Sequence, residues 1–384
     1  MRFLTTCIIP IAFCTSLALP SGCLASEPTP LDSAHPIVGT ATFGHTYPGA
    51  TVPFGMVQLS PDTGLSGWEH CSGYHYEDKA ILGFSHNHLS GTGCPDLGDI
   101  RITPLGPTPP PQNQEGFLCP FSHKDEVARP GYYSVLLQNP QVKVELTATA
   151  HAGFHKYSFS DGRPASLVFD LVRGIANEPA GVTMEGAVVV EKDNVLSGYR
   201  RSKGWAPDKT CFFVAEFSRP FDSVGIEVDG KPVNLSSPPA SLPKGEGRGV
   251  RVTARVGYKK PHQPILVKVG ISAVSVEGAR KNLAAEIPAW DFQGTIAAAA
   301  ASWNDVLGRV EIEAIDPATR EVFYTALYHA SMAPTLYNDA DGRYRGLDHK
   351  VHGPEGFQNY CTFSLWDTFR AEHALLTILQ PQRV

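Results

Sequence analysis

A change in the period of the hydrophobic pattern near residue 276 constrains this chain more than any other feature. Short alternating or continuous apolar runs, separated by turn residues, fill residues 31–275, and apolar residues recur at helical spacing after that point. Alternation with a period of two is typical of strands, whereas a spacing of three or four residues is typical of amphipathic helices. The pattern therefore predicts a strand-built domain followed by helices, not repeating βαβ units.

Six runs support the strand prediction, at 142–146, 154–159, 166–169, 187–190, 211–215 and 265–269. The dipeptides Asp161-Gly162 and Asp229-Gly230 are of the kind found in hairpin turns. The chain contains 36 glycines and 32 prolines, which favours many turns, and residues 107–111 and 236–249 are expected to be loops. We expect a mainly β protein whose residues 31–275 form an antiparallel β-sandwich.

Helices are predicted at 277–286, 291–307, 317–332 and 365–379. In the last of these, Phe369, Leu376 and Leu379 are expected to face inward. Asp316-Pro317 is a favourable start for the third, because Asp caps a helix and Pro fits its first position. We assign residues 276–310 to a helical linker and residues 311–384 to the truncated start of a larger helical domain, since so few helices cannot bury their own apolar faces.

The first 25 residues read as a signal peptide, with Arg2 followed by an apolar stretch that Pro10 interrupts. The chain is expected to be exported, periplasmic or extracellular, and Cys23 leaves open a lipoprotein anchor. No later segment is long and apolar enough to span a membrane. Export permits disulfides, and Cys71–Cys94 is one candidate pair. The net charge of −6 and the lack of a basic patch argue against a nucleic-acid partner.

The block at residues 67–100, GWEHCSGYHYEDKAILGFSHNHLSGTGCPDLGDI, is the densest in polar and aromatic side chains. Three interpretations stay open. His86 and His88, with nearby Cys94, Asp96 and Asp99, would suit a zinc or iron enzyme. The aromatic side chains Trp68, Tyr74 and Tyr76 would suit a sugar ring, whose C–H face packs on an aromatic surface. In the third interpretation, the block is an internally hydrogen-bonded cluster of loops that only fixes the connections between strands.

Two shorter motifs lie in the helical part. Asp339-Ala340-Asp341-Gly342 does not fit a calcium loop, because Lys350 stands where that loop needs its glutamate, and a tight turn is expected instead. Trp366-Asp367 begins the last predicted helix, where Asp367 would either cap the helix or bind a ligand. The sequence contains no G-x-S-x-G, no phosphate-binding P-loop and no H-E-x-x-H motif.

Three long segments, at 38–63, 67–100 and 364–384, resemble glycoside hydrolase family 92 and occur in that family's order. The resemblance implies a β-sandwich packed on an (α/α)6 barrel, with the active site at their junction. It also implies an exo-acting, calcium-dependent α-mannosidase that inverts the anomeric centre and acts on mannose-containing glycans. Inversion requires two carboxyl groups about 6.5–9.5 Å apart, with a water molecule between them.

The resemblance carries over to a few residues only. It implies substrate-binding roles for Trp68, Cys71, His86 and His88 on the sandwich side, and for Trp366 and Asp367 on the barrel side. No catalytic residue is assigned within the chain. The general acid, the general base and most calcium ligands are expected beyond Val384, so the chain alone is expected to be inactive. The alternative is a non-catalytic carbohydrate-binding sandwich.

Overall fold

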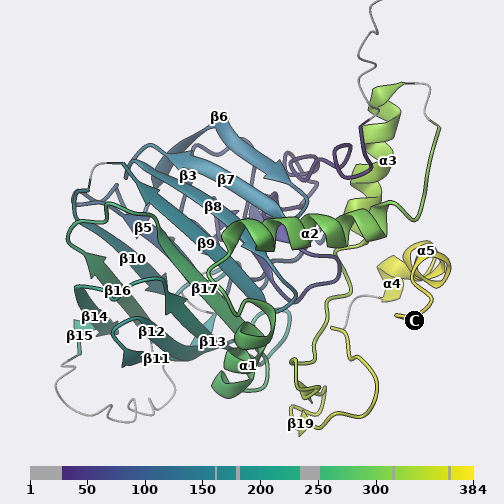
Figure 1. Ribbon diagram of the computed structural model, residues 1–384. Coiled ribbons are helices and arrows are strands. Elements are labelled where there is room, and N and C mark those ends of the chain that lie inside the picture. Colours follow the sequence, from purple (N-terminus) through teal and green to yellow (C-terminus); the bar gives the residue numbers. More distant parts are fainter. Residues whose placement is uncertain (1–27, 161, 179–181, 234–250, 314–315, 362–364) are drawn as a thin grey trace, which may run out of the picture.

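The computed structural model describes residues 28–160, 162–178, 182–233, 251–313, 316–361 and 365–384. Two antiparallel sheets stacked face to face form most of the molecule (Figure 1). The predicted signal peptide at residues 1–25 and the loop predicted at 236–249 both lie outside these residues. The predicted mainly β, antiparallel architecture is confirmed.

The first sheet has eight strands in the order β1-β2-β4-β5-β10-β16-β14-β15. Their bounds are β1 Ala50–Thr51, β2 Gln58–Asp62, β4 Gly83–Ser85, β5 Arg101–Leu105, β10 Ala165–Asp170, β16 Val252–Tyr258, β14 Ser223–Val228 and β15 Lys231–Pro232.

The second sheet has nine strands in the order β11-β12-β13-β17-β9-β8-β7-β6-β3. Their bounds are β11 Thr183–Lys192, β12 Val195–Ser202, β13 Lys209–Phe217, β17 Ile265–Ser272, β9 Ala152–Phe159, β8 Val142–Ala148, β7 Tyr132–Leu137, β6 Cys119–Arg129 and β3 Ala80–Ile81.

The main core lies between the two sheets, because alternate residues of each strand point inward. Leu167 and Phe169 of β10 face Phe213 and Phe217 of β13, and all four side chains are buried. Full burial of an aliphatic or aromatic side chain of this size contributes about 1.5–3 kcal/mol. This core is what holds the loops of the 67–100 block in place at one end of the sheets.

The two predicted hairpin turns differ in outcome. Asp229-Gly230 joins β14 to β15, and both residues have a positive φ, as a tight two-residue hairpin requires. The hairpin predicted at Asp161-Gly162 is wrong. It follows β9 of the second sheet and precedes β10 of the first, so it connects the two sheets; Asp161 itself lies outside the described residues.

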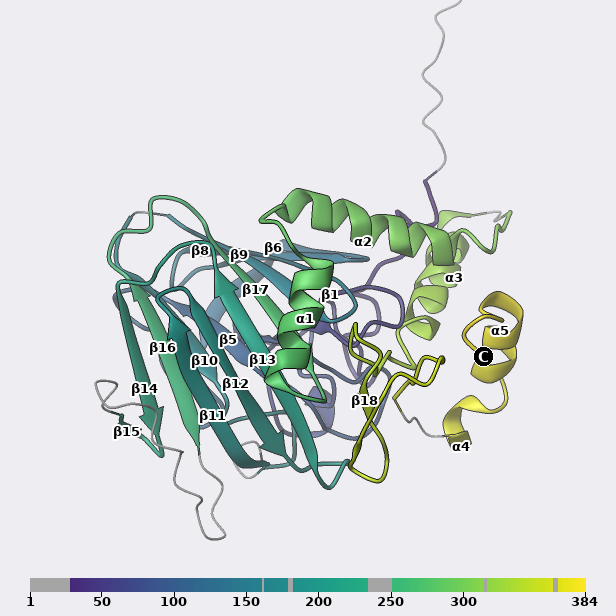
Figure 2. The ribbon, with the colours of Figure 1, turned by 60° about the horizontal axis from the view of Figure 1, so that its bottom comes forward.

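Two helices cover the outer face of the nine-stranded sheet. These are α1 (Val276–Glu286) and α2 (Phe292–Leu307), which lie across β13, β17 and β8 in Figures 1 and 2. Leu283 and Phe292 pack on Phe154 and Val214 of the sheet in a second apolar cluster. Trp303 is fully buried and its indole N–H donates to the Thr51 carbonyl at 2.7 Å. Both helices predicted for the linker therefore pack on the sandwich.

The helix α3 (Pro317–Ala330) begins at Asp316, whose side chain accepts from the Thr319 amide as predicted for an N-cap. It packs against α2 through a third apolar cluster that includes Tyr324, Leu327 and Tyr328. The helices seen after residue 316 are too few to define an (α/α)6 barrel, which stays a prediction.

The single helix predicted at 365–379 is wrong, because two helices occur there: α4 (Leu365–Thr368) and α5 (Glu372–Leu379). Leu375 and Leu379 of α5 pack against the third apolar cluster, and Leu376 is buried. Phe369, which was expected to face inward, is 54% exposed. Short helices depend on tertiary packing for stability, and only the second part of this segment has it.

The segment between α3 and α4 includes β18 (Tyr344–Arg345) and β19 (Val351–His352). Its Asp339 carboxylate accepts from Ser272 Oγ at 2.7 Å and from Asn282 Nδ2 at 2.8 Å. The predicted turn is present, because Gly342 has a φ of 81° and its amide donates to the Asp339 carbonyl. The carboxylate of Asp341 is engaged by Arg343 and Lys281.

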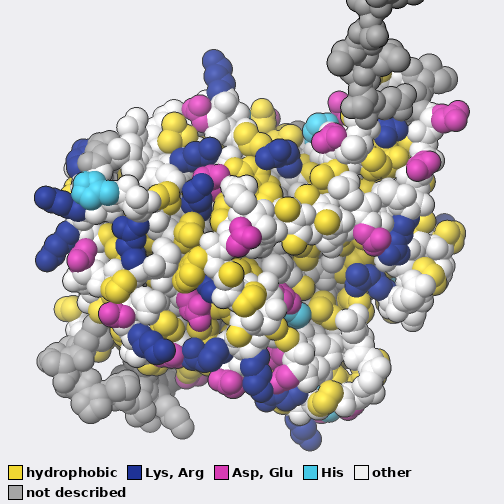
Figure 3. All heavy atoms as spheres, viewed as in Figure 1, with side chains coloured by type: hydrophobic (Ala, Val, Ile, Leu, Met, Phe, Trp, Pro, Cys, Tyr) yellow, Lys and Arg dark blue, Asp and Glu magenta, His cyan; other side chains and the backbone are white. Residues whose placement is uncertain are grey.

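The face shown in Figure 3 carries acidic and basic side chains of both signs interspersed, without one dominating sign. Over the described ranges, no helix is both long enough and apolar enough to cross a bilayer.

Candidate functional site

The loops of the 67–100 block project Trp68 from a short 3-10 helix, η1 (Trp68–His70), that follows Gly67. The Trp68 side chain is 53% exposed and packs edge-on against the ring of His45, with 4.8 Å between the ring centroids. A Cβ at Gly93 would lie 2.6 Å from the Trp68 ring, so this close approach requires glycine. An exposed indole held so tightly is suited to contacting a ligand.

A hollow of about 940 Å³ begins at this indole. Its lining includes Trp68, Cys71 and Cys94 from the block, together with Asn177, Glu178, Lys203 and Trp205 from two other loops. Trp205 is 76% exposed. The hollow thus combines two indoles with an amide, an amine and a carboxylate, and such groups suit a ligand that has both apolar faces and hydroxyls.

Backbone strain is concentrated in the same part of the chain. Non-glycine residues with a positive φ between positions 42 and 100 are Thr42, His45, Phe54, Leu97 and Ile100. Left-handed conformations of such residues persist only where the surrounding structure holds them, and they gather at functional sites. The loops around Trp68 therefore have a strained but well-anchored backbone.

His86 does not face the hollow. It is fully buried, with Nδ1 at 2.7 Å from the Ile100 carbonyl and Nε2 at 3.0 Å from Nε2 of His155. His155 Nδ1 in turn lies 2.9 Å from the Tyr157 hydroxyl. One assignment satisfies every atom: Tyr157 donates to His155, His155 donates to His86, and His86 donates to Ile100. Burial lowers the pKa of His86 to about 4 and that of His155 well below its usual value, so both rings are neutral.

His88 is also buried and has different partners. Its Nδ1 lies 2.7 Å from the Gln58 carbonyl, and its Nε2 lies 2.8 Å from Asp62 and 3.0 Å from the Ser85 hydroxyl. These three side chains resemble a nucleophilic triad in composition, but all are fully or almost fully buried, so a substrate has no access to Ser85. We interpret the cluster as an anchor of the loop between β4 and β5.

The two acidic residues proposed beside these histidines are ion-paired to the second sheet. Asp99 pairs with Arg200 of β12, and Asp96 pairs with Lys209 of β13. In the part of the chain that the structure describes, no group of three or more His, Cys, Asp or Glu side chains is arranged to hold a metal ion. The His86–His88 metal interpretation therefore has no donor set among the described residues, and calcium, whose ligands are mostly expected beyond Val384, stays a prediction.

The remaining predicted residues divide between the hollow and other places. Cys71 and Cys94 both line the hollow, but neither forms a disulfide, so the candidate pair is not bonded. Tyr74, expected in an aromatic surface, is instead buried and donates to Glu126 at 3.0 Å, because a phenol in the core needs an acceptor. Tyr76 stacks on His123 at 4.0 Å between centroids.

Trp366 and Asp367 lie in α4, and both are exposed. Neither lines the hollow around Trp68, and the Trp366 ring packs only loosely on Phe369, at 6.5 Å between centroids. The structure thus groups Trp68 with Cys71 at the hollow, buries His86 and His88 away from it, and leaves Trp366 and Asp367 on a separate short helix.

Sequence analysis missed Trp205, Asn177 and Glu178. Trp205 lies in the Gly204-Trp205-Ala206-Pro207 loop between β12 and β13. A tryptophan in a polar turn between two strands is exposed by position, which is a usable signal. Asn177 and Glu178 carry no such signal, because only the packing of their loop brings them to the hollow.

An antiparallel sandwich with an indole-rimmed polar hollow has the kinds of group that a carbohydrate-active protein uses. The model of the "Glycosyl hydrolase family 92 N-terminal domain" matches residues 34–272, and that of the "Glycosyl hydrolase family 92 catalytic domain" matches residues 278–384. The chain belongs to glycosyl hydrolase family 92.

Solved structures of this family are similar to the chain. A family 92 α-mannosidase from Bacteroides thetaiotaomicron, solved with mannoimidazole, is 34% identical with a TM-score of 0.82, over 91% of this chain and 46% of that one. An inverting mannosidase from the same species is 27% identical with a TM-score of 0.76, over 92% of this chain and 46% of that one.

A curated relative from Arthroderma benhamiae, described as an uncharacterized secreted glycosidase, is 27% identical over 332 residues. The alignment covers 78% of this chain and 41% of the relative. The chain therefore spans less than half the length of these relatives.

Proposed function

We propose that this chain forms part of an exported exo-α-mannosidase that releases terminal mannose from mannose-containing glycans by inversion. The observation that carries the proposal is the likeness to a family 92 α-mannosidase, at 34% identity and a TM-score of 0.82 over 91% of the chain. Within that enzyme, the sandwich would supply one wall of the sugar pocket. The Trp68 indole would cover the apolar face of a sugar ring, and the polar groups of the hollow would bind its hydroxyls.

The chemistry itself needs two carboxyl groups, one on each side of the scissile bond. Among the described residues that line the hollow, Glu178 is the sole carboxylate. We therefore propose that the general acid and the general base come from residues outside this sequence. We propose likewise that most ligands of the calcium ion implied by the family come from residues outside this sequence, since the described residues hold no cluster of His, Cys, Asp or Glu arranged for a metal ion.

The test is mannose release from α-linked mannobiose by the 384-residue chain, with calcium and with a chelator. We expect no turnover above the buffer rate. A version extended to the length of the relatives should release mannose with inversion, visible as β-mannose in an early proton spectrum. Robust turnover by the 384-residue chain would show that its own residues supply the acid and base, and an inactive extended protein would contradict the proposal.

With Glu178 as the sole carboxylate among the described lining residues, a second candidate is a carbohydrate-binding sandwich without activity. Calorimetric titration of the chain with methyl α-mannoside separates the two. Binding in the millimolar range or tighter that Trp68→Ala abolishes would support the binding module. Absence of binding would favour a pocket that is completed only by further residues.

A further inference from the structure

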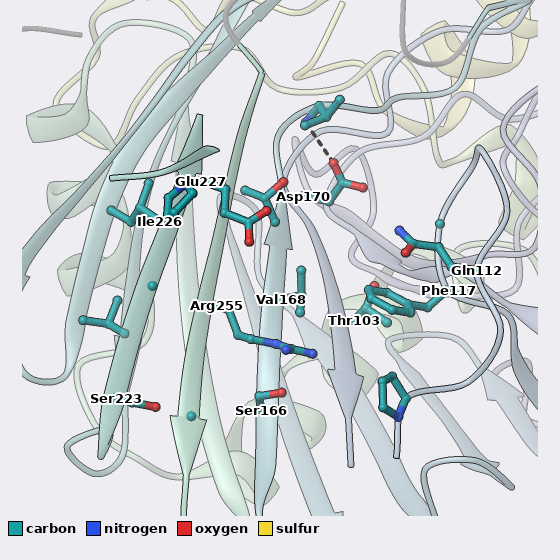
Figure 4. Close-up of a pocket in the computed structure, with 18 of the residues that line it drawn as sticks. Thr103, Gln112, Phe117, Ser166, Val168, Asp170, Ser223, Ile226, Glu227 and Arg255 are labelled. Carbon is teal, nitrogen blue, oxygen red and sulfur yellow. Dashed lines mark hydrogen bonds between the residues drawn. The ribbon is translucent and has the colours of Figure 1, made fainter. Parts of the chain in front are cut away.

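A second, larger hollow lies on the outer face of the eight-stranded sheet, whose partner sheet carries α1 and α2. Its volume is about 1480 Å³. The strands β5, β10, β16 and β14 form its floor, and the loop containing Gln112 and Phe117 forms one wall (Figure 4). None of its lining residues lines the hollow around Trp68.

Strand register arranges the floor in rows. One row has a carboxylate at two of its four positions and runs Arg101, Asp170, Thr253, Glu227. The next row, two residues along each strand, runs Thr103, Val168, Arg255, Gly225. The third runs Leu105, Ser166, Gly257, Ser223, and its last three residues are small. Successive rows are about 6.6 Å apart, because a strand rises about 3.3 Å per residue.

Arg255 stands at the centre of this floor. Its side chain is exposed, and within the described ranges its guanidinium has no hydrogen-bond or ion-pair partner. Its cross-strand neighbour is Gly225, where an added Cβ would meet no atom within 4 Å. The guanidinium therefore has open space around it and hydroxyl groups of Ser166 and Ser223 on the adjacent row, as Figure 4 shows.

The charges around the floor favour an anion near Arg255. The cationic lining residues are Arg101, Arg173, Arg251, Arg255 and Lys259, against three acids, Asp170, Glu227 and Asp229. Asp170 is already neutralised, because Arg101 and Arg173 lie 2.7 Å and 2.9 Å from its Oδ2. Arg101 is only 1% exposed, and its Nε and Nη1 have no partner among the described groups, so its charge is not fully compensated.

Other groups around the floor suit hydroxyl groups. Glu227, in the row on the side of Arg255 away from the serines, is exposed and has no ion-pair partner among the described residues, so its carboxylate is free to accept hydrogen bonds. Gln112 and Phe117 overhang Thr103, which places an amide and an apolar ring on the wall (Figure 4). A sugar ring uses all three kinds of group: acceptors and amides for its hydroxyls and an apolar ring for its C–H face.

We propose that this hollow binds an anionic saccharide, with its phosphate or carboxylate on Arg255 and its ring hydroxyls on Ser166 and Ser223. A free guanidinium pairs with either anion through two parallel hydrogen bonds. The choice of a saccharide rests on the proposed function, since a glycosidase meets glycans. Binding here, away from the Trp68 hollow, would hold a charged branch of a glycan on the sheet.

The test is a titration of the 384-residue chain by saturation-transfer difference NMR at low ionic strength. The probes are mannose 6-phosphate, glucuronic acid and methyl α-mannoside. Inorganic phosphate carries no carbon-bound protons to observe, so it is added as a competitor of the sugar signals. We expect millimolar binding of at least one of the two anionic sugars and at least tenfold weaker binding of the neutral sugar and of phosphate alone. The two anionic probes distinguish a phosphate ligand from a carboxylate ligand.

Three variants locate the site. Arg255→Ala should weaken the anionic sugar at least tenfold. Lys143→Ala, which removes an exposed cation from β8 on the other sheet, should leave it unchanged, as should Trp68→Ala. Equal affinity in Arg255→Ala, loss of binding in Trp68→Ala, or phosphate alone binding as tightly as its sugar ester would each overturn the proposal. Because no turnover is measured, an inactive enzyme leaves this result unaffected, and failure here leaves the mannosidase proposal standing.

Discussion

At the residue scale, the position of Trp68 depends on a neighbour without a side chain. A Cβ at residue 93 would lie 2.6 Å from the indole, well inside contact distance, so the ring must move. We predict that Gly93→Ala shifts the Trp68 indole N–H resonance in a proton–nitrogen spectrum, with the peak assigned through Trp68→Phe. Gly353→Ala is the control, because its Cβ meets nothing within 4 Å. An unshifted Trp68 peak in Gly93→Ala would contradict the packing described.

The buried His86–His155 pair makes a prediction about pH. Burial depresses the pKa of both rings, so the unfolded chain takes up protons below about pH 6.5 while the folded chain does not. Stability is therefore present above this pH and is lost as the pH falls toward 4, at about 1.4 kcal/mol per pH unit for each histidine.

We predict that His155→Gln reduces the dependence of the unfolding free energy on pH by about 1.4 kcal/mol per pH unit between pH 6.5 and 5. The measurement is urea unfolding at successive pH values. Carboxylates contribute little in this window because most titrate below it in the unfolded chain. Above pH 7.5 the curves of wild type and variant should run parallel, which serves as the internal control. Identical slopes between pH 6.5 and 5 would show that His155 is not held neutral.

At the element scale, Trp303 joins α2 to strand β1. Trp303 is fully buried among Tyr47, Leu307 and Tyr328, and it donates to the Thr51 carbonyl at 2.7 Å. Replacing a buried tryptophan by alanine leaves a cavity and costs about 3–5 kcal/mol. It also leaves the Thr51 carbonyl without this donor.

We predict that Trp303→Ala lowers the unfolding free energy by about 3–5 kcal/mol in a urea titration followed by circular dichroism. Ser302→Ala, at an exposed position of the same helix, is the matched control and should change stability little. A loss below about 1 kcal/mol for Trp303→Ala would mean that α2 contributes little to holding the sandwich.

At the scale of the whole molecule, apolar side chains are exposed at the C-terminal helices. Leu365, Trp366, Phe369 and Ile378 are each more than half exposed, and Trp366 reaches 84%. Exposed apolar surface of this extent promotes association. We predict that the 384-residue chain self-associates at micromolar concentration in sedimentation velocity, and that Phe369→Glu combined with Ile378→Glu reduces the associated fraction.

Val127→Glu is the control for that experiment, since Val127 is an exposed valine of β6 far along the chain from this patch. It should leave association unchanged. A monodisperse wild-type chain with one cooperative melting transition would show that these side chains do not drive association.

Most of the fold could be predicted because strands and helices leave periodic patterns. The alternation in 142–146 and the Asp316-Pro317 cap are local signals, and both elements occur as expected. The Asp161-Gly162 turn was misassigned because a turn dipeptide does not show whether the chain returns to the same sheet or crosses to the other. The last helix was misassigned because its first turn lacks the packing that its pattern implied.

The site was predicted only in part. Trp68 and Cys71 were selected together and do line one hollow, whereas His86 and His88 turn inward to partners that are distant in sequence, such as His155 and Asp62. Trp205 and Glu178 reach the same hollow from loops that are distant in sequence from the block.

The sequence by itself determined the succession of strands and helices, the caps and turns, and the family to which the chain belongs, because these depend on residues that are close together along the chain. Only the tertiary structure decided which polar side chains face solvent and which are buried. The residues next to a histidine or an arginine in the sequence do not show whether it is buried or exposed. That depends on which other strands and loops pack against it. The free guanidinium of Arg255 and the neutral pair of His86 and His155 are both consequences of that packing.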